Sequence, residues 1–312
     1  MTEVEAEPSV AATGSPSFVD AGRSGLNGFW RYAVGAVLVA LVYLGASAVS
    51  VIAMFLLSGG SFDVEVLFDS DTLPAEQLLA LVMLPAVGLL IGTMVVVLFL
   101  HRRSMRSVFT GAATIRWSRV ALGAALWAGL TAALELVAFA LDPGNYGFSF
   151  EAARFWPVAV VAILLVPIQS AAEELFFRGY LLQGLGVVLG RPWAAVLITS
   201  VGFGLLHGAN PEMEQFGQTF LLYYIGMGLL LALVTLLDGG LELAIGAHAA
   251  NNLYGALIVS FPGSVLDMPA IFRMVTFPVG QMSIFGAVAG LAFFLVLRRA
   301  SPWGRLGAIL LP

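Results

Sequence analysis

Eight long apolar stretches follow one another along the chain and restrict the folds that it can adopt. They cover roughly residues 29–57, 76–100, 117–141, 155–188, 192–210, 217–237, 241–261 and 274–298. A helix needs about 20 apolar residues to cross the hydrocarbon core of a bilayer. Hydrophobic residues make up 60% of the sequence and charged residues only 11%, against about 25% charged residues in a soluble domain. We therefore predict an all-α membrane protein, a polytopic bundle of about eight transmembrane helices.

The two ends of the chain differ from the apolar stretches between them. Residues 1–26 are polar, acidic and rich in Ser, Gly and Pro, a composition typical of disordered segments. We predict a disordered cytoplasmic tail at 1–26, a single transmembrane domain at 27–300 and a short C-terminal tail at 301–312. Within the domain, Gly190–Pro192 and Asp238–Gly240 carry the glycines and the proline that end one helix and begin the next.

The arginines are distributed unevenly between the segments that join the apolar stretches. With a cytoplasmic N-terminus, eleven of them fall on the cytoplasmic side and two, Arg154 and Arg273, on the outer side. Short cytoplasmic loops of membrane proteins carry an excess of basic residues. We therefore expect both termini in the cytoplasm. The use of arginine without any lysine is typical of a GC-rich prokaryotic genome, so we expect an integral protein of a prokaryotic cytoplasmic membrane.

Two missing residue types exclude several kinds of chemistry. The chain has no cysteine, which excludes disulfides, thiol catalysis and thiolate metal sites. It has no lysine, which excludes a lysine nucleophile or Schiff base. The net charge of −5 is spread along the chain, so nucleic acid is not an expected partner.

Two adjacent carboxylates, Glu173 and Glu174, lie inside the fourth apolar stretch. An ionisable residue within a membrane costs roughly 2.5–3.5 kcal/mol on insertion scales and marks a functional site by default. Neighbouring residues point about 100° apart around a helix, so we expect the two carboxylates to face different partners. Glu174 and Arg178 are one turn apart and can pair on one face. We predict a structural ion pair between them, with Glu173 as the reactive carboxylate.

Two histidines in later apolar stretches are the natural partners of Glu173. Glu173 and His207 each lie about 25 Å from the turn at Gly190 if both helices are continuous, so an antiparallel hairpin brings them to one depth. We therefore predict that Glu173 faces His207. His248 and Asn252 share a face of the seventh stretch. As neutral hydrogen-bond donors they suit a developing oxyanion; polar contacts between helices are the alternative role for this pair.

These residues resemble the three ordered motifs of the CAAX protease and bacteriocin-processing family, which is related to type II CAAX prenyl endopeptidases. The motifs are Glu173-Glu174-xxx-Arg178, Phe203-xxx-His207 and His248-xxx-Asn252. The similarity covers about residues 155–260 and implies an intramembrane endopeptidase with its active site within a helical bundle.

The resemblance also implies a role for each motif residue. Glu173 and His207 would activate a water molecule for attack on the peptide bond. His248 and Asn252 would hold the oxyanion of the tetrahedral intermediate. The remaining motif residues would support the site, and they are Glu174, Arg178 and Phe203.

The need for a metal is open at this point. Catalytic zinc often has three protein ligands, and Glu173, His207 and His248 could supply a carboxylate and two imidazoles. The sequence contains no His-Glu-x-x-His motif. We favour a metal-free glutamate mechanism without a cofactor and keep Zn²⁺ as the alternative.

The sequence thus predicts an endopeptidase that hydrolyses peptide bonds of membrane-associated substrates. The expected partners are membrane lipid and a peptide or protein substrate, which could be transmembrane or lipid-modified. In a prokaryote, prenylated CAAX tails would be unexpected substrates.

Two other functions are compatible with the same buried residues. Buried Glu, Arg and His also mark proton relays, so a transporter or proton-coupled channel is one alternative, although the polar residues cluster in three stretches. Glu135 in the third stretch is the exception, and it could pair with Arg178 or line a cavity. The other alternative is a non-catalytic immunity or scaffold protein with a protease-like core.

Overall fold

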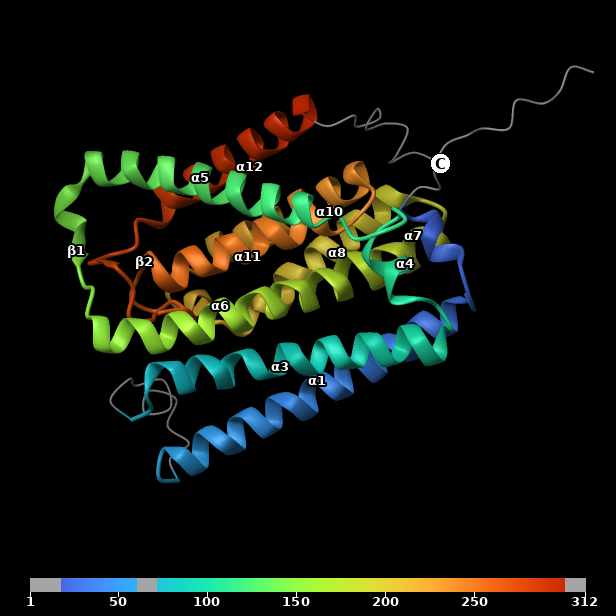
Figure 1. The fold of residues 1–312 in the computed structure, drawn as a ribbon, viewed down its shortest axis with the longest axis horizontal. Helices are drawn as coiled ribbons and strands as arrows, with labels where there is room; N and C mark the ends of the chain where they lie inside the picture. The colour runs from blue at the N-terminus through green and yellow to red at the C-terminus, as the bar shows by residue number, and fades with distance from the viewer. Residues whose placement is uncertain (1–17, 61–71, 301–312) are drawn as a thin grey trace, which may run out of the picture.

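The computed structural model describes residues 18–60 and 72–300, which form a bundle of long helices (Figure 1). Seven helical stretches in this part of the chain are long and apolar enough to cross a membrane. They are α1 (Phe29–Leu57), Ala75–Leu100, α5 (Trp117–Leu141), Ala152–Leu189, Pro192–Ala209, α10 (Gln218–Asp238) and α12 (Val279–Ala300). The predicted polytopic all-α membrane fold is confirmed.

Three of these stretches are composite. The second consists of α3 (Ala75–Val95) and the π-helical turn η2 (Val96–Leu100). The fourth consists of α6 (Ala152–Glu174), the π-helical segment η4 (Leu175–Leu182) and α7 (Gln183–Leu189). The fifth consists of α8 (Pro192–Leu206) and the 3-10 helix η5 (His207–Ala209). A π-helical segment directly after the Glu pair is notable, because such segments occur frequently at functional sites.

The seventh predicted stretch forms α11 (Glu242–Leu257), which has only 16 residues. The prediction of a helix to residue 261 is wrong, because the chain leaves the helix at Leu257 and Val259–Ser260 form strand β2. Every residue of α11 from Glu242 to Ala250 is buried. A short helix that lies inside protein does not need to match the thickness of a bilayer.

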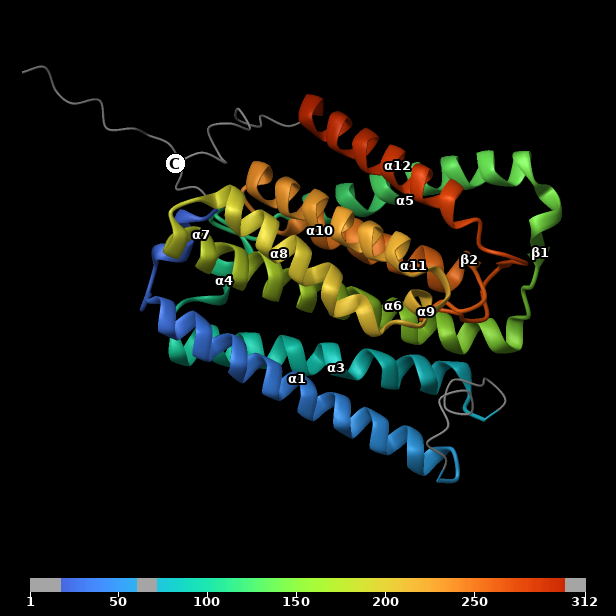
Figure 2. The same ribbon diagram turned by 180° about the vertical axis from the view of Figure 1, so that it is seen from behind.

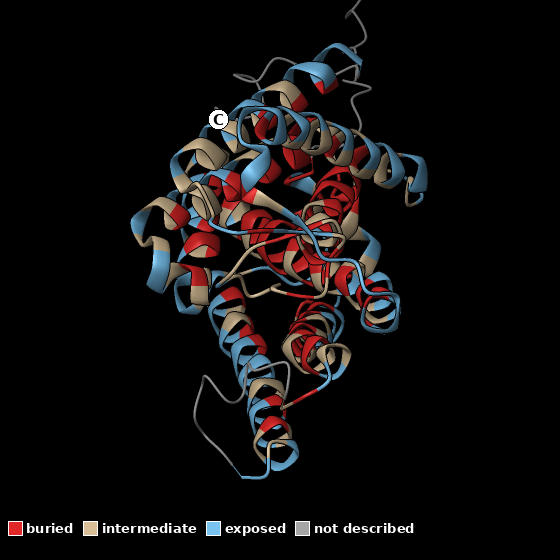
Figure 3. Ribbon diagram, turned by 90° about the vertical axis from the view of Figure 1, so that its left-hand side faces the viewer, coloured by how far each residue is buried: buried red, intermediate tan, exposed pale blue. Residues whose placement is uncertain are grey.

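The helices are arranged in three groups (Figures 1 and 2). The hairpin of α1 and α3 lies on one side, α5 and α12 lie on the opposite side, and α6, α8, α10 and α11 lie between them. Figure 3 shows the buried residues gathered in the centre of the bundle and the exposed ones on its outer helices. Many exposed residues of α1 and α12 are large and apolar, as expected for helices that face lipid.

A small sheet and short helices occupy the ends of the bundle. The strands β1 (Tyr146–Phe148), β3 (Phe272–Met274) and β2 pair in that order, the first pair antiparallel and the second parallel. Next to them lie η3 (Pro143–Asn145) and α9 (Pro211–Phe216), and at the opposite end lie α4 (Met105–Phe109) and α7 (Figures 1 and 2). The strands replace the start of the last predicted helix, which begins at Val279 rather than at residue 274.

The chain before α1 packs onto the bundle. Phe18 and Val19 are buried, and η1 (Asp20–Arg23) follows them. The side-chain amide of Gln183 donates a hydrogen bond of 2.9 Å to the Phe18 carbonyl oxygen, and the absence of a side chain at Gly186 leaves room for Val19. The prediction of disorder up to residue 26 is therefore wrong for residues 18–26. The remaining predicted tail segments, 1–17 and 301–312, lie outside the described residues.

Small residues allow α11 to lie very close to α5. A side chain at Gly246 would collide with the Val120 carbonyl oxygen, and one at Gly123 would collide with the Leu243 carbonyl oxygen. In lipid, helix association depends on close packing of this kind. The contact fixes the position of α11, the helix that carries His248.

We predict that Gly246→Ala destabilises the protein, because the added methyl group meets the α5 backbone. Overpacking of this kind costs about 1–3 kcal/mol, and the melting temperature in detergent should fall by several degrees. The control is Gly129→Ala in α5, where no described atom lies within 4 Å of an added Cβ. Equal melting temperatures for the two variants would contradict the assigned contact.

Candidate active site

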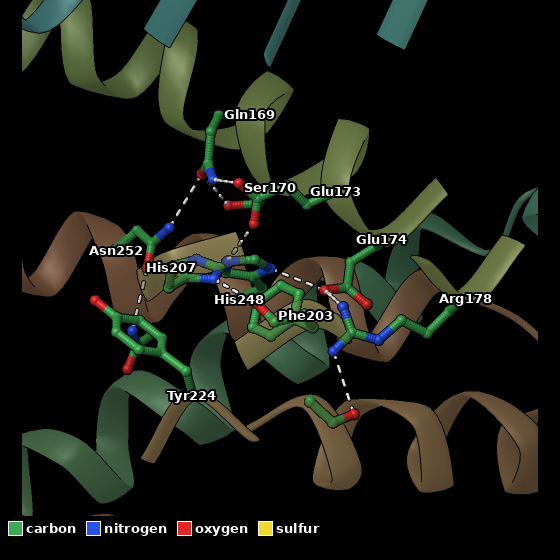
Figure 4. A network of polar contacts seen from close by, with 12 residues as sticks. Gln169, Ser170, Glu173, Glu174, Arg178, Phe203, His207, Tyr224, His248 and Asn252 are labelled. Carbon is green, nitrogen blue, oxygen red and sulfur yellow. Dashed lines mark hydrogen bonds and ion pairs between the residues drawn. The ribbon is translucent and has the colours of Figure 1, made fainter. Parts of the chain in front are cut away.

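The predicted site residues converge from three segments of the chain (Figure 4). Glu173 and Glu174 end α6, and Arg178 lies in η4. The other motif residues are Phe203 on α8, His207 at the start of η5, and His248 and Asn252 on α11.

Glu174 and Arg178 form the predicted ion pair. The Nη1 atom of Arg178 donates to Oε1 of Glu174 at 2.8 Å, and the side chains are 1% and 0% exposed. The guanidinium also donates to the Gly228 carbonyl oxygen at 3.2 Å and lies 4.4 Å from the ring centroid of Phe203. A buried ion pair is stable only when further contacts compensate for the loss of water, and Phe203 and Gly228 supply them here.

His248 lies between the two glutamates. Its Nδ1 atom is 2.8 Å from Oε1 of Glu174, and its Nε2 atom is 3.7 Å from Oε2 of Glu173. The expectation that the two glutamates face different partners is therefore wrong. The side chains do leave the helix in different directions, but they reach the two opposite nitrogens of one imidazole ring.

The contact with Glu174 determines which nitrogen of His248 carries a proton. An ionised carboxylate only accepts hydrogen bonds, so Nδ1 of His248 is the donor to Glu174. In the neutral ring Nε2 then carries only a lone pair. With this tautomer, Nε2 of His248 can donate to an oxyanion only when the ring is protonated.

Glu173 belongs to a short hydrogen-bonded chain that the motifs do not include. Gln169 donates from Nε2 to Oε1 of Glu173 at 2.6 Å, and its own Oε1 accepts from Nδ2 of Asn252 at 3.0 Å. The other carboxylate oxygen of Glu173 is buried and has no hydrogen-bond partner among the described residues. Gln169 had a sequence signal, because it is a polar residue one helical turn before Glu173 in an otherwise apolar segment.

His207 is held by its own helix end. Its Nδ1 atom is 2.7 Å from the Phe203 carbonyl oxygen, which only accepts, so Nδ1 carries the proton and Nε2 keeps its lone pair when the ring is neutral. The ring stacks on Tyr224 with centroids 4.2 Å apart. Within the described chain no hydrogen bond or ion pair joins His207 to Glu173. Both residues line one cavity, and the 3-10 turn that follows α8 anchors the imidazole of His207 on Phe203.

A cavity of about 370 Å³ lies against these residues. Its wall includes the four residues to which we assigned chemistry, and they are Glu173, His207, His248 and Asn252. The ion pair of Glu174 and Arg178 is not part of the wall. A molecule bound in the cavity can therefore contact the first four residues. It cannot contact Glu174 or Arg178, which lie outside the cavity wall.

Two further polar residues in this region have defined positions. Asn251 accepts hydrogen bonds from Trp127 at 3.2 Å and Tyr223 at 3.1 Å, and it donates to Oδ1 of Asn252 at 3.1 Å. Glu135 accepts a hydrogen bond of 2.5 Å from Tyr146 and lines the cavity. Of the two positions considered for Glu135, the cavity wall is correct and pairing with Arg178 is not.

The possible zinc ligands do not form a metal site in this arrangement. Among the described residues, no group of three or more His, Cys, Asp and Glu side chains is placed to hold a metal ion. Glu173 and His248 are close, but His207 is turned toward Phe203 and Tyr224. We therefore derive no chemical step through a metal.

The fold and the site define a class of protein: a polytopic helical membrane protein with buried glutamate, histidine and arginine around a cavity. Residues 152–254 match the family model described as type II CAAX prenyl endopeptidase Rce1-like. The uncharacterized protein YyaK of Bacillus subtilis (strain 168) is 34% identical over 256 residues, which cover 80% of this chain and 85% of YyaK. No solved structure matches the chain significantly. The chain belongs to the Rce1-like family, as its motifs predicted.

We predict that Glu174→Ala destabilises the protein strongly, because it leaves Arg178 buried without its carboxylate. Removing one partner of a buried pair costs about 3–5 kcal/mol, which should lower the melting temperature and the yield of folded protein. The control is Glu214→Ala, since Glu214 is exposed. A Glu174→Ala protein as stable as the control would show that the pair does not support the fold.

Proposed function

We propose that this protein is an intramembrane endopeptidase that hydrolyses peptide bonds by attack of a water molecule. Membership of the Rce1-like family supports a CAAX-protease-like peptidase at the level of the family. The observation that carries the proposal is the buried Oε2 atom of Glu173, which has no hydrogen-bond partner among the described residues. It lies in a cavity wall that also contains His207 and His248. A carboxylate with a free oxygen beside two imidazoles has the groups that peptide hydrolysis requires.

Glu173 is proposed as the general base. Its Oε1 atom is held by Gln169, so the free Oε2 atom can accept a hydrogen bond from a water in the cavity. The lone pair on Nε2 of His207 is a second acceptor that orients the same water. Glu173 takes a proton as the water oxygen bonds to the carbonyl carbon, and it returns that proton to the leaving amine as the peptide C–N bond breaks.

Asn252 and His248 are proposed to stabilise the oxyanion. One N–H of the Asn252 amide is bound to Gln169, and the second is available to donate. His248 can donate from Nε2 only as an imidazolium, while Nδ1–H stays on Glu174. The charge on this ring would then lie beside the negative charge that forms on the substrate oxygen. Donors directed at developing charge contribute most to catalysis of this kind.

Glu173→Gln should abolish hydrolysis with little change in the fold. A glutamine can keep the contact with Gln169 but cannot take a proton, and loss of a general base lowers rates by about 10²–10⁴-fold. Turnover of a quenched fluorescent peptide by purified protein in detergent or nanodiscs measures the loss. The matched control is Glu214→Gln, and a folded Glu173→Gln protein with full activity would refute the mechanism.

We expect activity without an added metal, because the mechanism uses only the side chains of this chain. Treatment with a strong chelator, followed by removal of the chelator, should leave kcat/KM unchanged within twofold. The control is a known zinc peptidase treated in the same way. Loss of activity with specific recovery on addition of Zn²⁺ would refute the metal-free proposal.

A further inference from the structure

Glu212 is a buried carboxylate in the cavity wall that belongs to none of the motifs. It lies on α9, is 3% exposed and lines the same cavity as Glu173. Its Oε1 atom accepts hydrogen bonds from the Val265 N–H at 2.9 Å and from the Ser264 hydroxyl at 3.3 Å. Its Oε2 atom is buried and has no hydrogen-bond partner among the described residues. A buried polar atom without a partner is costly, so a bound group that donates to it would be favoured.

The surroundings of Glu212 place it close to the proposed catalytic residues. Burial raises the pKa of Glu212, and the hydrogen bonds from Val265 and Ser264 oppose that shift. Glu212 follows His207 by five residues and lines the same cavity as Glu173, His207 and His248. A group bound to Glu212 would therefore lie within a few residues of the bond that is cleaved.

Carboxylates are the only charged side chains in the described cavity wall besides the two histidines, His207 and His248. Three carboxylates line it, and they belong to Glu135, Glu173 and Glu212. No arginine belongs to the described lining, and the chain has no lysine. Glu135 is already bound to Tyr146 and Glu173 to Gln169. Of the cavity carboxylates outside the proposed chemistry, Glu212 is the one in the described chain with a buried oxygen that has no hydrogen-bond partner.

Aromatic side chains make up much of the remaining wall near α9 and α10. They are Phe220, Tyr223, Tyr224, Phe261 and Phe277. Aromatic faces attract cations, and a carboxylate next to them adds a directional acceptor. The described wall contains no arginine side chain that could bind an anionic group.

We infer that Glu212 is a specificity-determining residue that binds a basic side chain, Arg or Lys, of the peptide substrate next to the cleaved bond. The inference rests on the proposed endopeptidase function and names the class of its substrate. The cationic group would donate to Oε2, while Oε1 stays bound to the loop residues Ser264 and Val265. A peptide with a carboxylate at the same position would be rejected, because two negative charges would meet in a buried site.

The test uses quenched fluorescent peptides with acetylated N-termini that differ at one position at a time, within four residues of the cleaved bond. That position is Arg, Gln or Glu. At the best position we expect wild-type kcat/KM for the Arg peptide to exceed that for the Gln peptide by about 10- to 100-fold, the range for a hydrogen bond to a charged group. In Glu212→Gln this preference, the ratio of kcat/KM for the Arg peptide to that for the Gln peptide, should fall below about threefold. Equal cleavage of all peptides by wild type, or an unchanged preference in the variant, would overturn the inference.

The variant Ser264→Ala tests whether the preference for Arg depends on the charge of Glu212 or on the hydrogen bond between Glu212 and the loop. This variant removes one hydrogen bond to Oε1 and keeps the carboxylate, so the preference for Arg should remain. If Ser264→Ala loses the preference as fully as Glu212→Gln does, the loop position and not the charge determines specificity, and the inference fails.

A binding measurement separates this inference from the proposed function. The Glu173→Gln protein should be stabilised against thermal unfolding by the Arg peptide more than by the Gln peptide, and the Glu173→Gln/Glu212→Gln protein should not distinguish them. If wild type cleaves no peptide but this difference is found, the endopeptidase proposal fails and recognition of a basic side chain stands. If cleavage is found without the difference, recognition by Glu212 fails and the endopeptidase proposal stands.

Discussion

The contact of Glu174 with both Arg178 and His248 is the interaction on which the rest of the site depends. One carboxylate oxygen accepts from Arg178 and from His248, each at 2.8 Å. This single atom joins η4 to α11, and Arg178 continues the connection to α10 through Gly228. At the depth of a bilayer each of these charges alone would be costly. Together they neutralise one another and orient the histidine that faces the cavity.

Close packing of α11 makes this contact possible. The glycine contacts between α5 and α11 hold the short helix in the centre of the bundle, and burial of all its first nine residues leaves it little freedom to move. The imidazole of His248 is therefore held at the same level of the bundle as Glu173 and Glu174. Asn251 strengthens the same arrangement, since its bonds to Trp127 and Tyr223 connect α11 to α5 and α10.

Local spacing in the sequence was enough to predict part of the site. The pairing of Glu174 with Arg178 follows from positions one helical turn apart, which depends on one helix only. The position of His248 between the glutamates depends on how α6 and α11 cross, and helix lengths alone do not give it. Helix lengths also do not show that α8 ends in a 3-10 turn, which anchors the ring of His207 on the Phe203 carbonyl oxygen. Glu212 was missed because α9 lies in a short connection between apolar stretches, without a periodic signal.

In the proposed mechanism, the charge on the His248 ring affects both the stability of the buried cluster and the reaction. Two ionised carboxylates, Glu173 and Glu174, and the guanidinium of Arg178 sum to one net negative charge. A protonated His248 brings the sum for the four side chains to zero. Because the two glutamates lie at the two nitrogens of His248, the charge that neutralises the buried cluster is also the one that allows Nε2 to donate. A substrate oxygen that becomes negative would compete with Glu173 for that proton. Movement of Glu173 toward the water and release of Nε2–H to the oxyanion would then be coupled, and the carboxylate pair would serve both the stability of the bundle and the reaction.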